Sequence, residues 1–212
     1  MNKISKLLCA FALFALTVAM AAFLLPTQAQ AATIASGTCG KNLTWTLDDA
    51  GQLTISGTGE MEDYDWTALP WGKEIKAVTI DNGVTSIGDY AFYGCSSLAS
   101  VTIPGSVTRI GRWAFTECHS LKSVTIPDGV TSIGDWAFSC CSSLTSITIA
   151  DSVTSIGNWA FEGCSSLTSI TIPDSVTSIG NDAFYGCSRM TSITISDSVT
   201  SIGDRAFCGC SS

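Results

Sequence analysis

Apolar and polar positions follow a regular repeat, one 23-residue unit after another, through most of the chain. In the unit at residues 141–163, CSSLTSITIADSVTSIGNWAFEG, Ile147 and Ile149 alternate with serine and threonine, which predicts a half-buried strand. Val153 and Ile156 predict a second, shorter extended segment, and the WAF sequence that follows predicts one helical or 3₁₀ turn. Each unit is therefore expected to form one coil.

Phenylalanine and cysteine mark the repeat most clearly, because each recurs once per unit at a constant interval. The two sets are Phe92, Phe115, Phe138, Phe161, Phe184 and Phe207, and Cys95, Cys118, Cys141, Cys164, Cys187 and Cys210. A fixed period of this length is typical of a solenoid, in which each coil contacts only its neighbours. Stacked coils share the strand hydrogen bonds and apolar contacts that a single coil lacks.

One segment, from Leu121 through Pro127 and Ile133 to Phe138 and Cys141, carries a recognisable motif. It resembles the 23-residue leucine-rich repeats of BspA-like bacterial surface proteins, and the similarity extends from about residue 72 to the end. The resemblance implies a mainly β fold of the α/β leucine-rich-repeat class. The expected architecture is a right-handed solenoid of about six coils with short helical or 3₁₀ turns and an N-terminal β-hairpin cap.

Three segments are predicted along the chain. Residues 1–31 have the features of a secretory signal peptide. Basic residues precede an apolar run at 7–25, and a small-x-small AQA sequence follows it. The alternative is an uncleaved membrane anchor. Residues 33–71 are expected to form a β cap and a loop, with a hairpin formed by 43–47 and 52–56. Residues 72–212 are expected to form a solenoid that is incomplete at its C-terminal end and open to self-association.

Charge narrows the choice of partners. The chain has 18 acidic and 10 basic residues, and loss of residues 1–31 would change its net charge from −8 to −10. Repulsion from phosphate argues against nucleic acid and anionic lipid, and no membrane insertion is expected after signal cleavage. The periodic cysteines are predicted to be buried free thiols, with pairing between adjacent coils as the alternative, whereas Cys39, Cys140 and Cys208 lie outside that column.

No arrangement of catalytic residues is visible, so the chain is not expected to be an enzyme or to use a cofactor. His119 is the only histidine, and it is expected at the surface. No metal site is predicted, because Cys-x-x-Cys and histidine spacings are absent. The acidic stretch at 57–71 is interpreted as a solvated loop with Trp66 and Trp71 packed on the first coil, and calcium binding is the less favoured alternative.

Two rows of side chains are candidate binding surfaces. An aromatic ladder is formed by the residues before the Ala-Phe pairs, Tyr90, Trp113, Trp136 and Trp159. Aromatic rings can bind sugars or protein side chains, but they can also stack on one another and shield the turns. The second candidate is the strand face, which carries Thr102, Thr125, Thr148 and Thr171. Solenoids bind partners through such extended faces, whereas the alternative role of these threonines is to stabilise the strands.

Three functions remain open at this stage. The resemblance to BspA-like repeats implies a secreted or surface-exposed adhesion module that contacts host matrix proteins or other cells. The aromatic ladder suggests a carbohydrate-binding module instead. The third hypothesis is a structural spacer that displays another domain.

Overall fold

The computed structural model describes residues 31–211, and residues 32–211 belong to one unit. This part of the chain is built from strands and turns, and none of it is helical. It therefore has no helix that could cross a membrane. The predicted signal peptide lies almost wholly outside the described residues.

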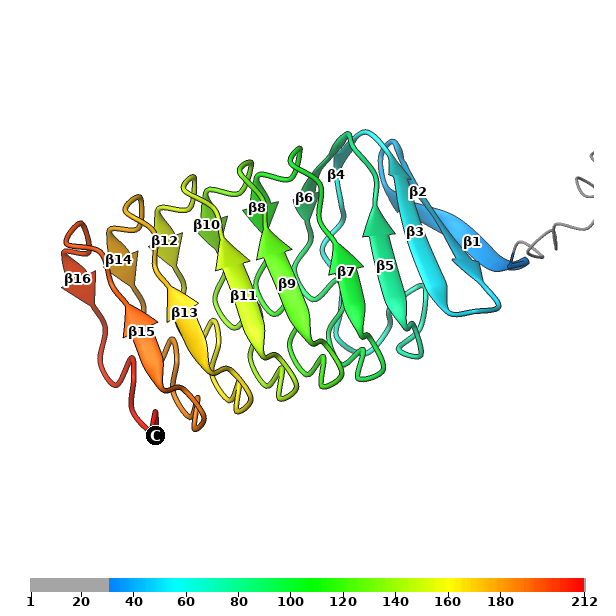
Figure 1. The fold of residues 1–212 in the computed structure, drawn as a ribbon. Coiled ribbons are helices and arrows are strands. Elements are labelled where there is room, and N and C mark those ends of the chain that lie inside the picture. The colour runs from blue at the N-terminus through cyan, green and yellow to red at the C-terminus, as the bar shows by residue number, and fades with distance from the viewer. Residues whose placement is uncertain (1–30, 212) are drawn as a thin grey trace, which may run out of the picture. The chain divides into compact units, whose positions relative to one another are not determined.

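The strands form two parallel rows along the solenoid (Figure 1). The front strands are β1 (Thr33–Gly40), β2 (Leu43–Asp48), β3 (Gln52–Gly57), β5 (Ala77–Ile80), β7 (Ser100–Thr102), β9 (Ser123–Ile126), β11 (Ser146–Ile149), β13 (Ser169–Thr171) and β15 (Ser192–Thr194). The back strands are β4 (Gly59–Glu60), β6 (Val84–Ile87), β8 (Arg109–Ile110), β10 (Ser132–Ile133), β12 (Ser155–Ile156), β14 (Ser178–Ile179) and β16 (Ser201–Ile202).

Successive coils pair in parallel with the register that the repeat predicts. In the back row, for example, Ser132 is opposite Ser155, and Ile133 is opposite Ile156. The seven back strands form one continuous sheet, whereas regular pairing of the front strands is interrupted between β7 and β9 and between β11 and β13. The constant spacing of the repeat therefore places equivalent side chains in columns.

The N-terminal segment extends both rows of strands. β1, β2 and β3 are antiparallel, which confirms the predicted hairpin, and β3 then pairs in parallel with β5. β4 pairs in parallel with β6. Gln52 is opposite Ala77, an offset slightly longer than the period of the later coils, so the β3–β4 coil lies outside the regular array. The cap thus contributes one coil in addition to the expected six.

The predicted helical or 3₁₀ turn is wrong. The residue before each Ala-Phe pair has a left-handed backbone, with φ of 59° at Tyr90, 60° at Trp136 and 53° at Trp159. A left-handed residue interrupts a right-handed helix. Its amide bonds to the next coil instead, as in the 2.9 Å bond from Trp136 N to Asn158 O. The turn that contains the Ala-Phe pair is therefore hydrogen-bonded from coil to coil, as the front and back strands are.

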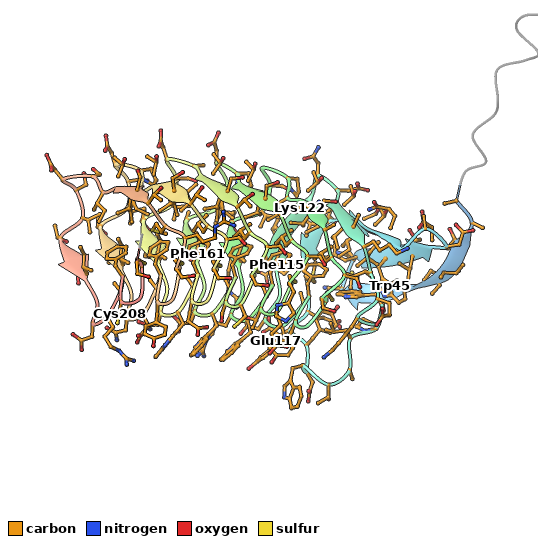
Figure 2. All side chains as sticks on the ribbon, turned by 60° about the horizontal axis from the view of Figure 1, so that its bottom comes forward. Trp45, Phe115, Glu117, Lys122, Phe161 and Cys208 are labelled. Atoms are coloured by element: carbon orange, nitrogen blue, oxygen red, sulfur yellow. The ribbon has the colours of Figure 1, made fainter. Side chains whose placement is uncertain are left out.

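The core consists of columns of identical side chains. The phenylalanine rings of successive coils stack with centroids 5.0–5.6 Å apart, and Trp71 extends the stack at 5.6 Å from Phe92. Figure 2 shows Phe115 and Phe161 inside the coils. Beside this stack, cysteine thiols contact phenylalanine carbonyls of the preceding coil, as in the 3.2 Å contact from Cys141 to Phe115.

All nine cysteines of the described residues are free thiols, which agrees with the prediction made for the six periodic ones. Burial raises the pKa of Cys95 and of Cys187 to about 12, and it raises the pKa of Cys39 to about 11. A thiol with such a pKa stays protonated near neutral pH and is a poor nucleophile. The cysteine column therefore fills space in the core.

Candidate functional site

The strand face is the outward side of the front strands β7, β9, β11, β13 and β15. Two columns of exposed hydroxyl side chains cover it, one of serine and one of threonine. They are Ser100, Ser123, Ser146, Ser169 and Ser192, and Thr102, Thr125, Thr148, Thr171 and Thr194. The apolar residues between them point inward, because side chains alternate along a strand.

The hydroxyl groups of the strand face form no side-chain hydrogen bond within residues 31–211, whereas threonines elsewhere on the coils do. Thr154 Oγ1, beside the back strands, donates to the carbonyl of Thr131 at 3.0 Å. Thr177 and Thr200 repeat this bond on later coils at 3.3 and 3.2 Å. These threonines at the edges of the coils thus bond to the scaffold, while those of the strand face are exposed and have no hydrogen-bond partner within the described residues.

A shallow hollow of about 560 Å³ lies on the strand face. It is lined by residues of β11, β13 and β15 and of the loops that follow, and it spans the interruption between β11 and β13. Asp151 and Asp174 form part of its rim. They belong to a column of four exposed aspartates, Asp128, Asp151, Asp174 and Asp197. The rim of the strand face is therefore acidic over several coils.

The structure stacks the predicted aromatic ladder face to face. The ring centroids of Trp113 and Trp136 are 4.5 Å apart with an interplanar angle of 6°, and those of Trp136 and Trp159 are 4.5 Å apart at 7°. Tyr90 is stacked 6.0 Å from Trp113. Each inner ring thus has both faces against its neighbours. A sugar stacks on the face of a ring, so the ladder offers a ligand only its edges and its two end faces.

Two further aromatic residues lie at the Tyr90 end of the ladder: Tyr93, which the sequence did not single out, and Trp66, which was predicted to pack on the first coil and contacts it at Tyr93. Tyr93 lies 5.9 Å from Tyr90, and Trp66 from the irregular loop lies 6.3 Å from Tyr93. Together with Trp113 they line a second hollow of about 230 Å³. The repeat pattern could not indicate this group, because Trp66 precedes the regular array.

Other polar side chains of the coils and of the loop have structural contacts. Asp135 Oδ1 accepts a hydrogen bond from Asn158 N at 2.8 Å, and Asn158 Oδ1 accepts from Asn181 N at 2.8 Å. This column therefore caps the backbone of the following coil. His119 is exposed, and its Nδ1 lies 2.8 Å from the carbonyl oxygen of Cys140. In the loop, Asp65 Oδ1 accepts a 2.9 Å bond from Thr67 N.

Stacked strands, buried columns of identical side chains and a constant coil-to-coil register define the class of a leucine-rich-repeat solenoid. Comparison with known proteins supports this class. A family model described as the BspA type leucine rich repeat region matches residues 71–188 and 137–212, in six copies. The chain belongs to this BspA-type leucine-rich-repeat family.

Solved structures show the same fold. A leucine-rich-repeat protein of T. pallidum is 26% identical with a TM-score of 0.68, and the match covers 82% of this chain and 88% of that one. A Bacteroides ovatus leucine-rich-repeat protein is 25% identical with a TM-score of 0.54, covering 80% of this chain. A leucine-rich cell surface protein of Faecalibacterium prausnitzii is 30% identical with a TM-score of 0.51, covering 78% of this chain.

The chain spans 56% of each of the latter two proteins. A search of curated proteins finds no match. The comparisons therefore show the repeat family and its fold, which are consistent with a protein-interaction module.

Proposed function

We propose that this protein is an exported interaction module that binds other proteins at the bacterial cell surface through its strand face. The observation that carries the proposal is the array of free hydroxyl groups on that face. Threonine at the coil edges forms a side-chain hydrogen bond to the preceding coil, as at Thr154 and Thr177, but threonine on the strand face forms none in the described residues.

The charge of the rim suggests the kind of partner. Exposed aspartates border the strand face on four consecutive coils, and two of them line the hollow. Complementary charge speeds association and selects partners. The strand face therefore suits an extended protein segment that carries lysine or arginine. Host matrix proteins and surface proteins of neighbouring cells offer such segments, and the similarity to a cell surface protein supports this location.

The two other functions have weaker support. Carbohydrate binding by the aromatic ladder is restricted because its inner rings stack on one another. The ladder therefore stays a predicted carbohydrate site, but its inner rings could contact a sugar only through their edges. The spacer function has no feature of the described residues that specifically supports it. Binding experiments separate all three functions.

The test is a binding screen of the purified protein against matrix proteins and a glycan array, repeated with two matched double variants. Thr148→Arg with Thr171→Arg places two cations on the strand face. Thr154→Arg with Thr177→Arg places the same charge on the same two coils beside the back strands. We expect the first pair of substitutions to weaken binding to a matrix protein at least tenfold and the second to have little effect.

Circular dichroism and thermal unfolding serve to check that both double variants fold. Equal binding by the two variants would contradict the use of the strand face. Binding to glycans alone, removed by Trp136→Ser with Trp159→Ser, would favour the carbohydrate-binding function. An absence of binding in both screens would favour the spacer.

A further inference from the structure

The hollow beside the first regular coils has walls made almost entirely of aromatic rings. Trp66, Tyr90, Tyr93 and Trp113 line it, and its volume is about 230 Å³. Trp66 is 55% exposed, so its indole is available to a ligand. None of these rings belongs to the strand face, which makes this hollow a separate feature of the molecule.

The rings border this open hollow at several angles. The ring of Tyr93 makes an angle of 67° with that of Trp66, 59° with that of Tyr90 and 59° with that of Trp113. All three neighbouring centroids lie 5.9–6.5 Å from the Tyr93 centroid. This arrangement differs from the flat stacking in the rest of the ladder. Rings that meet at steep angles form a concave wall, to which Trp113 contributes only an edge because both of its faces are stacked, whereas a sugar ring needs a flat surface.

Cations already lie near tyrosine rings at this position of the repeat. The ammonium nitrogen of Lys73 lies 5.3 Å from the Tyr93 centroid. Tyr185, four repeats later in the same column, has the guanidinium carbon of Arg205 at 5.6 Å from its centroid. Both distances are within the range of an attractive cation–π contact. The negative ring faces at this edge of the solenoid thus attract positive charge.

An acidic group adds to this attraction. The Tyr93 hydroxyl donates a hydrogen bond to Glu117 Oε1 at 3.1 Å. Glu117 has a left-handed backbone with φ of 61° at a repeat position where four other coils have glycine, and Figure 2 shows it at the turn edge of the coils. The nearby arginines have carboxylate partners, since Arg109 pairs with Asp89 and Arg112 with Asp135. Lys73 is the cation that a ligand would meet at Tyr93.

We propose that this aromatic hollow is a binding site for a small quaternary ammonium cation, the trimethylammonium group of a choline moiety. Such a cation has no N–H donor and is weakly hydrated, so it gains more from ring faces than from water. A box of indole and phenol rings is the recognised way in which proteins bind quaternary ammonium groups. The carboxylate of Glu117 and the net charge of −8 favour a cation over a neutral ligand.

The experiment measures binding of choline chloride by isothermal titration calorimetry and by saturation-transfer NMR on its N-methyl signal. The neutral isostere 3,3-dimethyl-1-butanol has the same shape without the charge, and a soluble glucose oligomer serves as a carbohydrate probe. Sodium chloride keeps the ionic strength equal in all titrations. We expect saturable choline binding in the millimolar range and at least about tenfold weaker binding of the isostere.

Variants locate the site. Trp66→Ala removes an exposed wall and is expected to abolish the choline signal without loss of folding. Tyr93→Leu should weaken binding at least about tenfold, whereas Tyr185→Leu, the matched change at the same repeat position, should leave it unchanged. Lys73→Met removes the resident cation and should strengthen binding.

Several results would overturn the proposal. They are equal binding of choline and its isostere, absence of saturation, an unchanged choline signal in Trp66→Ala, and equal effects of Tyr93→Leu and Tyr185→Leu. Binding of the glucose oligomer without choline binding would also overturn it. Each of these results is independent of whether the strand face binds a protein.

Discussion

Replacement of Phe138 by alanine tests whether the stacked phenylalanines hold successive coils together. Phe138 is fully buried, and its ring stacks 5.1 Å from Phe115 and 5.6 Å from Phe161. The substitution leaves a cavity between two coils that cannot close, because both neighbours are fixed by coil-to-coil hydrogen bonds. Removal of a buried phenylalanine ring costs about 3–5 kcal/mol. A domain of this size is stable by about 5–15 kcal/mol, so the loss is a large fraction of the total.

Phe207→Ala is the matched control at the end of the same column. Phe207 is only partly buried and stacks on one ring, that of Phe184 at 5.4 Å. Its removal should cost about 1–2 kcal/mol, because less transfer free energy is lost and the site opens to water. Nearest-neighbour coupling in a solenoid therefore predicts a clear difference between the two variants.

Urea unfolding, followed by tryptophan fluorescence and by circular dichroism, gives both free energies of unfolding. Agreement between the two signals shows whether the transition is two-state, which repeat arrays do not always obey. A cost below about 1 kcal/mol for Phe138→Ala, or equal costs for the two variants, would refute the reasoning that places the main coil contacts in this column.

Four further predictions concern thiols, backbone and ends. In the native protein a thiol reagent should label exposed Cys208 first and the fully buried Cys118, Cys141 and Cys164 only after unfolding. The free energy of unfolding should fall as pH rises from 9 towards 12, because burial raises the pKa of the folded thiols and the unfolded chain loses those protons first. Cys118→Ala should reduce the slope of unfolding free energy against pH, measured by urea unfolding. Cys140→Gly should raise the free energy of unfolding by about 1 kcal/mol in the same assay, because φ is 57° there. Ile202 is 50% exposed on the last back strand, so Ile202→Lys should reduce any self-association seen by sedimentation.

The period carried most of the information about the fold. Because phenylalanine and cysteine recur once per repeat at a constant interval, the parallel register and the buried columns could be predicted from the sequence alone. The helical turn was predicted wrongly because WAF has ordinary helical residues, and nothing in that sequence shows that its first residue is left-handed. The hydrogen bonds from coil to coil impose that conformation, and they depend on neighbours that a local pattern does not include.

The candidate sites were less predictable for a related reason. The threonine columns could be placed on the strand face from their alternation with isoleucine, but only the structure shows that their hydroxyls are free while those of Thr154 and Thr177 are bonded. The sequence predicted that the ladder residues lie in a row. It could not show that their rings stack face to face, because ring orientation does not follow from the spacing. Trp66 and Tyr93 come together through an irregular loop, and no repeat spacing relates them.

Hydrogen–deuterium exchange of the protein, alone and bound to a partner found in the screen, tests the central functional claim most directly. If the strand face is the binding surface, protection on binding should be confined to β7, β9, β11, β13 and β15 and the loops after them, while the back strands exchange as in the free protein. Protection of the back strands or of the turn edge, with the front strands unchanged, would contradict the account.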